Sequence, residues 1–299
     1  MATAVSSLAR IRSAAVSARG FQTAAVVTLV LLWLVVTTGG LVRLTASGLG
    51  CPHWPTCEAN HLVPSASYHA VIEFTNRVIS GVAMLASVAT AIMAYRVPGL
   101  KRGVCRAAAL AAAGTVAQVP LGALTVAFDL HPLLVMTHFL VAIVATGLAA
   151  VLFARFSAGA ATPPPRPQAW LARGSVLVAF GLIVSGAFST AAGPHAGGED
   201  IRRMGNLLDT TYVHVRVATT YIIVTAVLLL VLQFGPWRPE RWRGLALGLI
   251  VLLPLQAAIG EYQWHNQLPW GVVLAHVSVA AAAWITCVCL ATRIVGRRF

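Results

Sequence analysis

The chain has 299 residues, of which 58% are hydrophobic and 10% are charged, and its formal net charge is +13. A soluble domain carries about 25% charged residues, so this composition excludes an ordinary soluble globular protein. A run of about 20 apolar residues is long enough to cross a bilayer, and the sequence contains eight such runs. The composition therefore predicts an all-α integral membrane protein that lies in the lipid bilayer with eight transmembrane helices.

The expected spans, in chain order, cover residues 21–42, 69–94, 104–128, 132–154, 170–191, 211–234, 243–261 and 270–292. Residues 1–20 are basic and rich in Ala and Ser, like the start of a signal peptide. The apolar run that follows them is too long for a signal peptide, so we expect a retained first helix. Between the fourth and fifth spans, ATPPPRP (residues 161–167) favours neither helix nor strand because it is rich in proline.

This proline-rich segment predicts how the chain is divided. We expect an N-terminal cytoplasmic segment at 1–20, a four-helix bundle at 21–156, a cytoplasmic linker at 157–169 and a second four-helix bundle at 170–299. The expected fold is therefore two tandem, pseudo-symmetric four-helix bundles.

The positions of the cations predict how the helices are oriented. Sixteen of the 21 Lys and Arg residues lie in the two termini and in the connections at 95–106, 155–173 and 235–243. Because cytoplasmic connections are enriched in Lys and Arg, we expect both termini on the cytoplasmic side of the plasma membrane. The connections at 43–68, 129–131, 192–210 and 262–269 then face outward. This topology explains the positive charge, which does not indicate binding to nucleic acid.

The five cysteines fall into two groups. Cys51 and Cys57 lie in the first outward connection, where an oxidising environment favours a disulfide between them. Such a pair can be redox-active or can be a static staple of the loop, and the sequence leaves both interpretations open. Cys105, Cys287 and Cys289 lie in or beside the cytoplasmic halves of helices and are expected to be packing residues.

A repeat of 138 residues relates the two expected bundles. Pairs with this separation are Gln118 and Gln256, Gly122 and Gly260, His138 and His276, and also Asn76 and His214. We therefore expect the second, fourth, sixth and eighth helices each to carry one polar group at an equivalent depth near the outer leaflet. The two bundles are expected to be related by an axis along the membrane normal.

The histidines of the second bundle predict a haem site. Histidine in a membrane helix is energetically unfavourable and usually functional. Two imidazoles on facing helices suit the two axial positions of a haem iron, whereas zinc needs a third or fourth ligand. We therefore expect His214 and His276 to bind a haem. Arg77 and Arg216 lie in helices close to these positions, where each can pair with a haem propionate or with a structural carboxylate.

The first bundle carries a carboxylate at a position where the second bundle has none. Glu73 precedes Asn76 by three residues, so the two side chains share a helix face and are expected to point toward the same space. Thr211 stands at the equivalent position of the second bundle. A carboxyl group in a low-dielectric site can move protons. The second bundle therefore has the properties of a holding site, and the first those of a reactive site with an incomplete ligand set.

Several motifs, in this order, resemble those of the haem A synthases. SGLGCPHWPTC resembles the first outer loop of that family with its cysteine pair, and EFTNR resembles the Glu-x-x-His-Arg motif of its second helix. The GALTV stretch with the later His138 resembles its fourth helix. AGPHAGGEDIRR followed by TYVHVRVA resembles its outer loop and sixth helix, and LAHVSVAAA resembles its eighth helix. The resemblance covers essentially the whole chain.

This resemblance implies an oxidoreductase that converts a methyl group of haem O into the formyl group of haem A, through hydroxylated intermediates, for terminal cytochrome oxidases. It implies that His214 and His276, with Arg216 nearby, hold a haem b cofactor in the second bundle. The expected partners are the haem O substrate and, from the order of the pathway, a haem O synthase and cytochrome oxidase assembly factors. Lipid-facing and oligomer-forming helix faces have the same composition, so the sequence leaves an oligomer open.

The resemblance also assigns the first bundle to the haem O substrate. It implies that His138 is a ligand of the substrate, that Glu73 is the functional glutamate, and that the two loop cysteines form a disulfide. Arg77 then anchors a propionate or orients Glu73.

Asn76 departs from the family, many of whose members carry histidine there, and makes this chain an actinobacterial-like variant. In one hypothesis His138 alone holds haem O and the other face of the iron stays open. In a second hypothesis His131 and His69, each seven residues before His138 and Asn76, act as ligands nearer the outer surface.

Three other functions compete with the synthase. A membrane cytochrome with a bis-His haem b, transferring electrons from quinol, would share the helices and ligands but would not need Glu73. A protein that carries haem O without chemistry is a second alternative. A thiol oxidase using Cys51 and Cys57 is the third, and it leaves the histidines unexplained.

Overall fold

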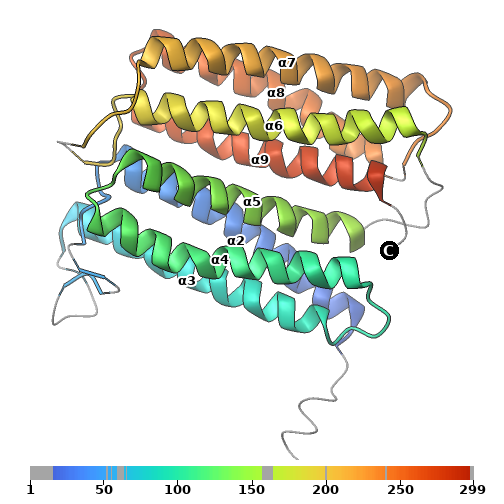
Figure 1. The fold of residues 1–299 in the computed structure, drawn as a ribbon, viewed down its shortest axis with the longest axis horizontal. Coiled ribbons are helices and arrows are strands. Elements are labelled where there is room, and N and C mark those ends of the chain that lie inside the picture. Colours follow the sequence, from blue (N-terminus) through green and yellow to red (C-terminus); the bar gives the residue numbers. More distant parts are fainter. Residues whose placement is uncertain are drawn as a thin grey trace, which may run out of the picture.

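The structure, a computed structural model, describes residues 16–51, 53–54, 56–58, 64, 66–156, 164–198, 201–239 and 241–296. These ranges contain eight long helices, each apolar enough to cross a membrane. They are α2 (Ala18–Leu44), α3 (Tyr68–Ala94), α4 (Arg102–Ala127), α5 (Pro132–Phe156), α6 (Arg166–Ala192), α7 (Leu207–Phe234), α8 (Trp242–His265) and α9 (Trp270–Val295). The predicted all-α membrane fold with eight spans is confirmed (Figure 1).

Polar side chains begin three of the helices. Ser17 accepts a hydrogen bond from the N–H of Gly20, Ser67 does the same for Ala70, and Asn206 accepts from the first N–H groups of α7. These N-caps satisfy backbone donors that have no partner inside the helix.

The start of α6 differs from the expectation for the proline-rich segment. This helix begins at Arg166, inside the linker expected at 157–169, and includes Pro167 in its first turn. Proline is tolerated there because the first N–H groups of a helix need no intrahelical acceptor. Residues 157–163 of the expected linker lie outside the described part of the chain.

The helices form two groups of four, as predicted. The first half contains α2–α5 and the second half α6–α9, which Figure 1 shows as the blue-to-green and the yellow-to-red ribbons. The halves meet where α2 and α5 pack against α9, with a smaller contact between α5 and α6. The connections after α2, α4, α6 and α8 share one end of the helices, which we call the disulfide end.

Two indole groups tie the halves together within the apolar region. Trp33 Nε1 donates to the carbonyl of Ser278 at 3.1 Å, and Trp284 Nε1 donates to the carbonyl of Ile143 at 3.0 Å. A Cβ at Gly147 would lie 2.9 Å from the Trp284 ring, so glycine permits this close approach of α5 and α9. Small residues and interhelical hydrogen bonds of this kind stabilise helix packing in a membrane.

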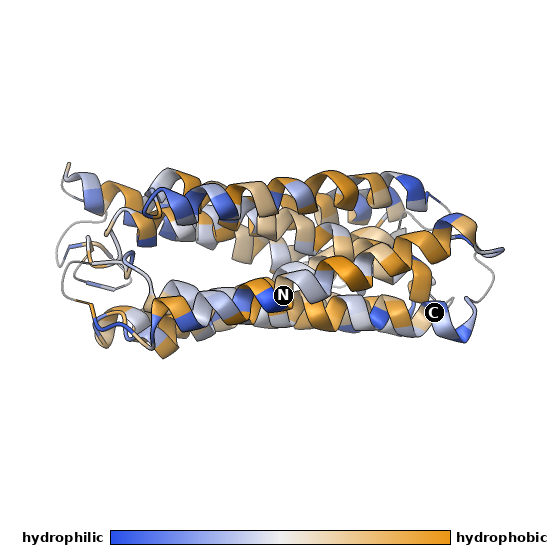
Figure 2. Cartoon of the chain, turned by 90° about the horizontal axis from the view of Figure 1, so that it is seen from above, coloured by the Kyte–Doolittle hydropathy of each residue, from blue (hydrophilic) through white to orange (hydrophobic). Residues whose placement is uncertain are grey.

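Hydropathy along the helices agrees with a membrane location. Figure 2 shows apolar residues along the middle of the helices and hydrophilic segments toward the two ends. Large apolar side chains, among them Leu85, Leu177 and Phe234, are exposed on the outside of the molecule. In a lipid environment these side chains need no further cover.

The cysteines lie where the sequence predicted. Cys51 and Cys57 form a disulfide and are fully buried. Cys105, Cys287 and Cys289 are unpaired and buried in apolar clusters between helices, which confirms that they are packing residues.

Candidate functional site

A cavity of about 640 Å³ lies in the second half, with Leu44, Phe139 and Ile143 of the first half along its border. His214 of α7 and His276 of α9 both line it, with ring centroids 6.4 Å apart and ring planes 65° apart. Helix α7 packs against α6 and helix α8 packs against α9, but α7 and α8 make almost no direct contact with each other. The cavity therefore lies between two helix pairs, and its volume is within the roughly 300–1,000 Å³ of small-molecule sites.

Helix α6 positions the ring of His214. The hydroxyl oxygen of Ser185 lies 3.0 Å from Nδ1 of His214. A Cβ at Gly186 would lie 2.9 Å from Cε1 of the same ring, so the imidazole occupies space that glycine leaves. Because Ser185 engages Nδ1, Nε2 is the nitrogen of His214 that can bind a metal.

Helix α8 positions the segment that carries His276. The side-chain amide of Gln256 donates to the carbonyl of His276 at 3.0 Å, and a Cβ at Gly260 would lie 3.3 Å from Cε1 of the ring. Nδ1 of His276 is buried and has no hydrogen-bond partner among the described residues. Buried polar atoms without a partner are rare in folded proteins.

The two rings fit the axial positions of one haem iron. An imidazole nitrogen lies about 2 Å from a first-row metal, so two rings on opposite sides of one ion need centres about 6 Å apart. The observed separation of the two centroids is 6.4 Å. The cavity and the ring separation together make His214 and His276 suitable ligands for a haem.

The first half repeats the surroundings of His276 around His138. The amide of Gln118 donates to the carbonyl of His138 at 3.2 Å, and a Cβ at Gly122 would lie 3.6 Å from Cε1 of the ring. Nδ1 of His138 is also buried without a partner in the described ranges. The repeat of 138 residues in the sequence is therefore also a repeat of contacts in three dimensions.

Asn76 of α3 has a hydroxyl partner on the preceding helix, as His214 does. The Thr38 hydroxyl donates to Oδ1 of Asn76 at 2.7 Å. Sequence reasoning missed Thr38 and its counterpart Ser185. The signal that could have found them is a hydroxyl–glycine dipeptide, TG at 38–39 and SG at 185–186, which recurs after 147 residues.

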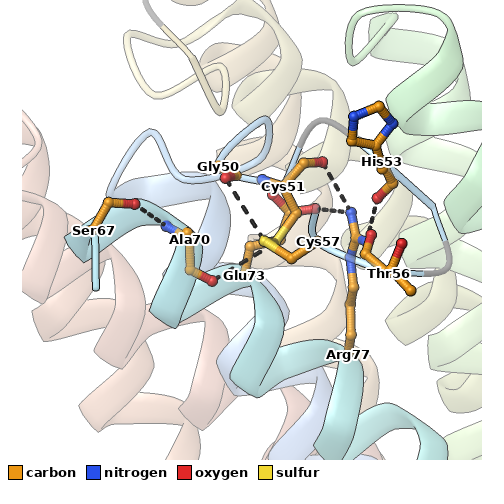
Figure 3. Close-up of a disulfide and its surroundings, with 9 residues drawn as sticks. All are labelled: Gly50, Cys51, His53, Thr56, Cys57, Ser67, Ala70, Glu73 and Arg77. Carbon is orange, nitrogen blue, oxygen red and sulfur yellow. Dashed lines mark hydrogen bonds and ion pairs between the residues drawn. A yellow bond between two sulfur atoms is a disulfide. The ribbon is translucent and has the colours of Figure 1, made fainter. Parts of the chain in front are cut away.

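Glu73 and Arg77 lie beneath the disulfide loop, as Figure 3 shows. The N–H of Cys51 donates to Oε2 of Glu73 at 2.8 Å, and Arg77 donates to Oε1 at 2.5 Å. Arg77 also donates to the carbonyls of Cys51, His53 and Thr56. One guanidinium thus ties the carboxylate to the loop that the disulfide closes.

These contacts refine two expectations. Of the roles that the sequence left open for Arg77, the structure contains an ion pair with Glu73, which orients this carboxylate. Glu73 and Asn76 are three residues apart on one helix, but their contacts differ, since Glu73 binds the loop and Asn76 binds Thr38 of α2. The loop N–H and Arg77 hold the carboxylate toward the disulfide end.

Arg216 is not among the described residues that line the cavity. Its guanidinium lies over the ring of Tyr212, 4.5 Å from the centroid, and donates to the Tyr212 hydroxyl on the exposed side of α7. Residues two apart on a helix point in nearly opposite directions, so His214 and Arg216 face different sides of α7. A contact between Arg216 and a haem propionate stays a prediction.

The two alternative histidines lie at helix ends. Nδ1 of His69 is 3.0 Å from the hydroxyl of Ser47. The carbonyl of His131 accepts from the N–H groups of Leu134 and Val135 at the start of α5. Their role as iron ligands also stays a prediction.

Comparison with known proteins identifies relatives along most of the chain. The COX15-CtaA family, described as "Cytochrome oxidase assembly protein", matches residues 22–288. A protein named "Heme A synthase" from Shewanella oneidensis is 26% identical over 309 aligned residues, which cover 88% of this chain and 93% of the relative. A protein of the same name from Halalkalibacterium halodurans is 26% identical over 283 residues, with the same coverage.

A shorter segment of the chain is similar to a protein with a different name. A "Protoheme IX farnesyltransferase" from Thermus thermophilus is 44% identical over 70 residues, which cover 22% of this chain. The match spans 12% of the length of that relative, so the similarity concerns a segment of 70 aligned residues and not either whole protein.

Proposed function

Because the chain belongs to the COX15-CtaA family of cytochrome oxidase assembly proteins, we propose that it is a haem A synthase, which oxidises a methyl group of haem O to the formyl group of haem A. The observation that carries this proposal is the difference between two similar halves. The second half has a facing pair of histidines, His214 and His276. The first half has His138 and, at the position equivalent to His214, Asn76. A holding site and a reactive site need this difference.

In the second half, His214 and His276 hold a haem b cofactor. A bound haem of this kind accepts and donates single electrons. Ser185 fixes the tautomer and orientation of His214 through Nδ1, and Gln256 fixes the backbone that carries His276. Partners of ligating histidines orient the ligands in this way in metal sites generally.

In the first half, His138 binds the haem O substrate and Asn76 leaves the opposite face of the substrate iron open. Glu73 lies one turn from Asn76 and is 5% exposed, so its carboxylate acts in a site with little water. We assign it to accepting a proton or to stabilising positive charge that develops at the substrate carbon. Arg77 and the N–H of Cys51 hold both carboxylate oxygens and so position Glu73 for this task.

The division of the chain follows from this assignment. We assign α2–α5, expected at residues 21–156, to the substrate half, and α6–α9, which begin at Arg166 and not at 170, to the cofactor half, with the linker and both termini on the cytoplasmic side of the cell membrane. The disulfide end then faces outward, and both haem sites lie near the outer leaflet. The distribution of Lys and Arg, which are concentrated at the opposite end, supports this orientation.

Pigment analysis tests the function directly. The full chain is expressed in a host that makes haem O but no haem A, and the extracted membrane haems are separated by chromatography. We expect haem A or its hydroxylated precursor with the wild type and neither with Glu73→Ala. Asp209→Ala, which removes an exposed carboxylate in the first turn of α7 that is not among the described residues lining the cavity, is the matched control and should retain the product.

The opposite outcome would favour another function. If the purified wild-type protein holds haem B while haem O remains unchanged at full expression, the chain is a bis-His cytochrome and Asn76 marks a lost active site. If haem O copurifies without conversion, the chain is a carrier.

A further inference from the structure

Both halves contain a hydroxyl residue followed by glycine beside the position of a polar side chain, and we call this pair the frame. The frame of the second half surrounds the His214 imidazole, whereas that of the first half lies beside the shorter Asn76. In the second half the frame consists of Ser185, which contacts Nδ1 of His214, and Gly186, whose missing Cβ makes room for the ring. Thr38 and Gly39 are the corresponding dipeptide of α2, 147 residues earlier. Thr38 binds Oδ1 of Asn76 at 2.7 Å, so the hydroxyl performs the same task in both halves.

The glycines of the two frames have different surroundings. A Cβ at Gly186 would meet the His214 ring at 2.9 Å. A Cβ at Gly39 would meet no atom within 4 Å from outside its own stretch of helix, among the described residues. Gly39 therefore borders open space in a frame that elsewhere is filled by an imidazole.

The orientation of Asn76 gives this space a chemical character. Because the Thr38 hydroxyl donates to Oδ1, the Nδ2 group of Asn76 remains as a hydrogen-bond donor. An asparagine side chain ends before the position that Nε2 of a histidine at the same place would reach. Hydrogen-bond donors and steric access on the side opposite the protein ligand decide which small molecules a haem iron binds.

We propose that Asn76, Thr38 and Gly39 form a binding site for one small iron ligand, of the size of water or cyanide, on the face of the substrate haem opposite His138. This inference rests on the proposed function, since it needs a haem in the first half. It adds that the asparagine creates a selective ligand site, with Thr38 as the residue that positions its amide. The second half, whose frame is filled by His214, has no such site.

Cyanide titration of the purified, haem-loaded full chain tests the proposal, with the absorbance of the oxidised haems as the readout. We expect one of the two haems of the wild type to bind cyanide. Asn76→His should make that haem low-spin and weaken cyanide binding at least tenfold. Gly39→Val should weaken binding similarly at unchanged haem content, whereas Gly81→Val, at a glycine of α3 that also meets no neighbouring atom, should bind as the wild type does.

The converse variant uses the second half. His214→Asn places an asparagine beside Ser185 and Gly186, so the second haem should gain cyanide binding. Thr38→Ser should bind cyanide as the wild type does, while Thr38→Val, which no longer fixes the amide, should bind it several-fold more weakly.

Two results would overturn the inference in different ways. If both haems are present and neither binds cyanide, or if Asn76→His binds it as well as the wild type, the small-ligand site is wrong while the proposed function stands. If His138→Ala leaves the haem content unchanged, the first half holds no haem, and the substrate site and this inference both fail.

Discussion

The two halves of the molecule share a plan but differ in how tightly they close. In the first half α3 packs along α4, whereas the corresponding helices of the second half, α7 and α8, make almost no direct contact. The cavity between the helix pairs of the second half is lined by His214 and His276. The same order of helices therefore leaves α3 and α4 in contact in the first half and leaves α7 and α8 apart in the second.

The loops at the disulfide end differ as well. The loop after α2 is closed by the Cys51–Cys57 disulfide and is bound to Glu73 and Arg77 of α3. After α6, Arg203 donates to the carbonyl of Gly193, a contact within its own connection. The first loop therefore holds a carboxylate of the helix that follows it, whereas Arg203 holds the backbone of its own connection.

The largest effect is expected from removing an axial ligand of the second half. His276→Ala should abolish the low-spin haem signal of the purified protein, because the partner His214 cannot complete the axial pair alone. The measurement is the absorbance and electron paramagnetic resonance spectrum of the purified protein. His265→Ala removes another histidine of the same cavity, whose side chain is 73% exposed, and should leave the spectrum unchanged.

The next largest effect is a loss of stability when Arg77 of α3 is removed, compared with removal of Arg216 of α7. Arg77→Ala should lower the free energy of unfolding by about 3 kcal/mol, since it removes the ion-pair partner of a buried carboxylate and the Arg77 hydrogen bonds to three loop carbonyls. Arg216→Ala should change it by about 0.5 kcal/mol or less, because its contact with Tyr212 is exposed. Thermal unfolding followed with a thiol-reactive dye measures both, because the three unpaired cysteines are buried. Equal losses would contradict the proposed difference.

Alanine substitutions at Gly186 and Gly39 are expected to differ in their effect on stability, by less than the two arginine variants do. Gly186→Ala should destabilise the protein by about 1–3 kcal/mol, because the new methyl group would crowd the His214 ring. Gly39→Ala should be close to neutral, since its Cβ meets open space. The same dye assay applies, and a costly Gly39→Ala would show that the space beside Asn76 is closed.

The smallest expected effect concerns a hydrogen bond that both halves contain, between a glutamine side chain and the backbone of a histidine. Gln118→Leu and Gln256→Leu each remove one hydrogen bond to the carbonyl of a histidine, at His138 and His276. Each should cost about 1 kcal/mol. Similar losses of unfolding free energy would support the pseudo-symmetry, and a large effect in one half only would count against it.

Much of the fold and part of the site could be predicted from the sequence. The eight spans and the disulfide were predicted because apolar length and loop location depend on local sequence. The hydrogen bonds from Gln118 to the carbonyl of His138 and from Gln256 to that of His276 follow from the same 138-residue repeat, since equal spacing along two helices gives equal contacts. The start of α6 at Arg166 was not predicted, because the proline-rich segment was interpreted as a linker throughout, although Pro167 suits the first turn of a helix.

The sequence by itself determined which residues are polar within apolar helices, their spacing along the chain and hence the two-fold plan. Only the tertiary structure decided that Glu73 binds the disulfide loop, that Arg216 points away from the cavity, and that Gly39 and Gly186 meet such different surroundings. The physical reason is that spacing fixes the face of a helix on which a side chain lies. What that side chain meets depends on the neighbouring helix and on how far away it packs.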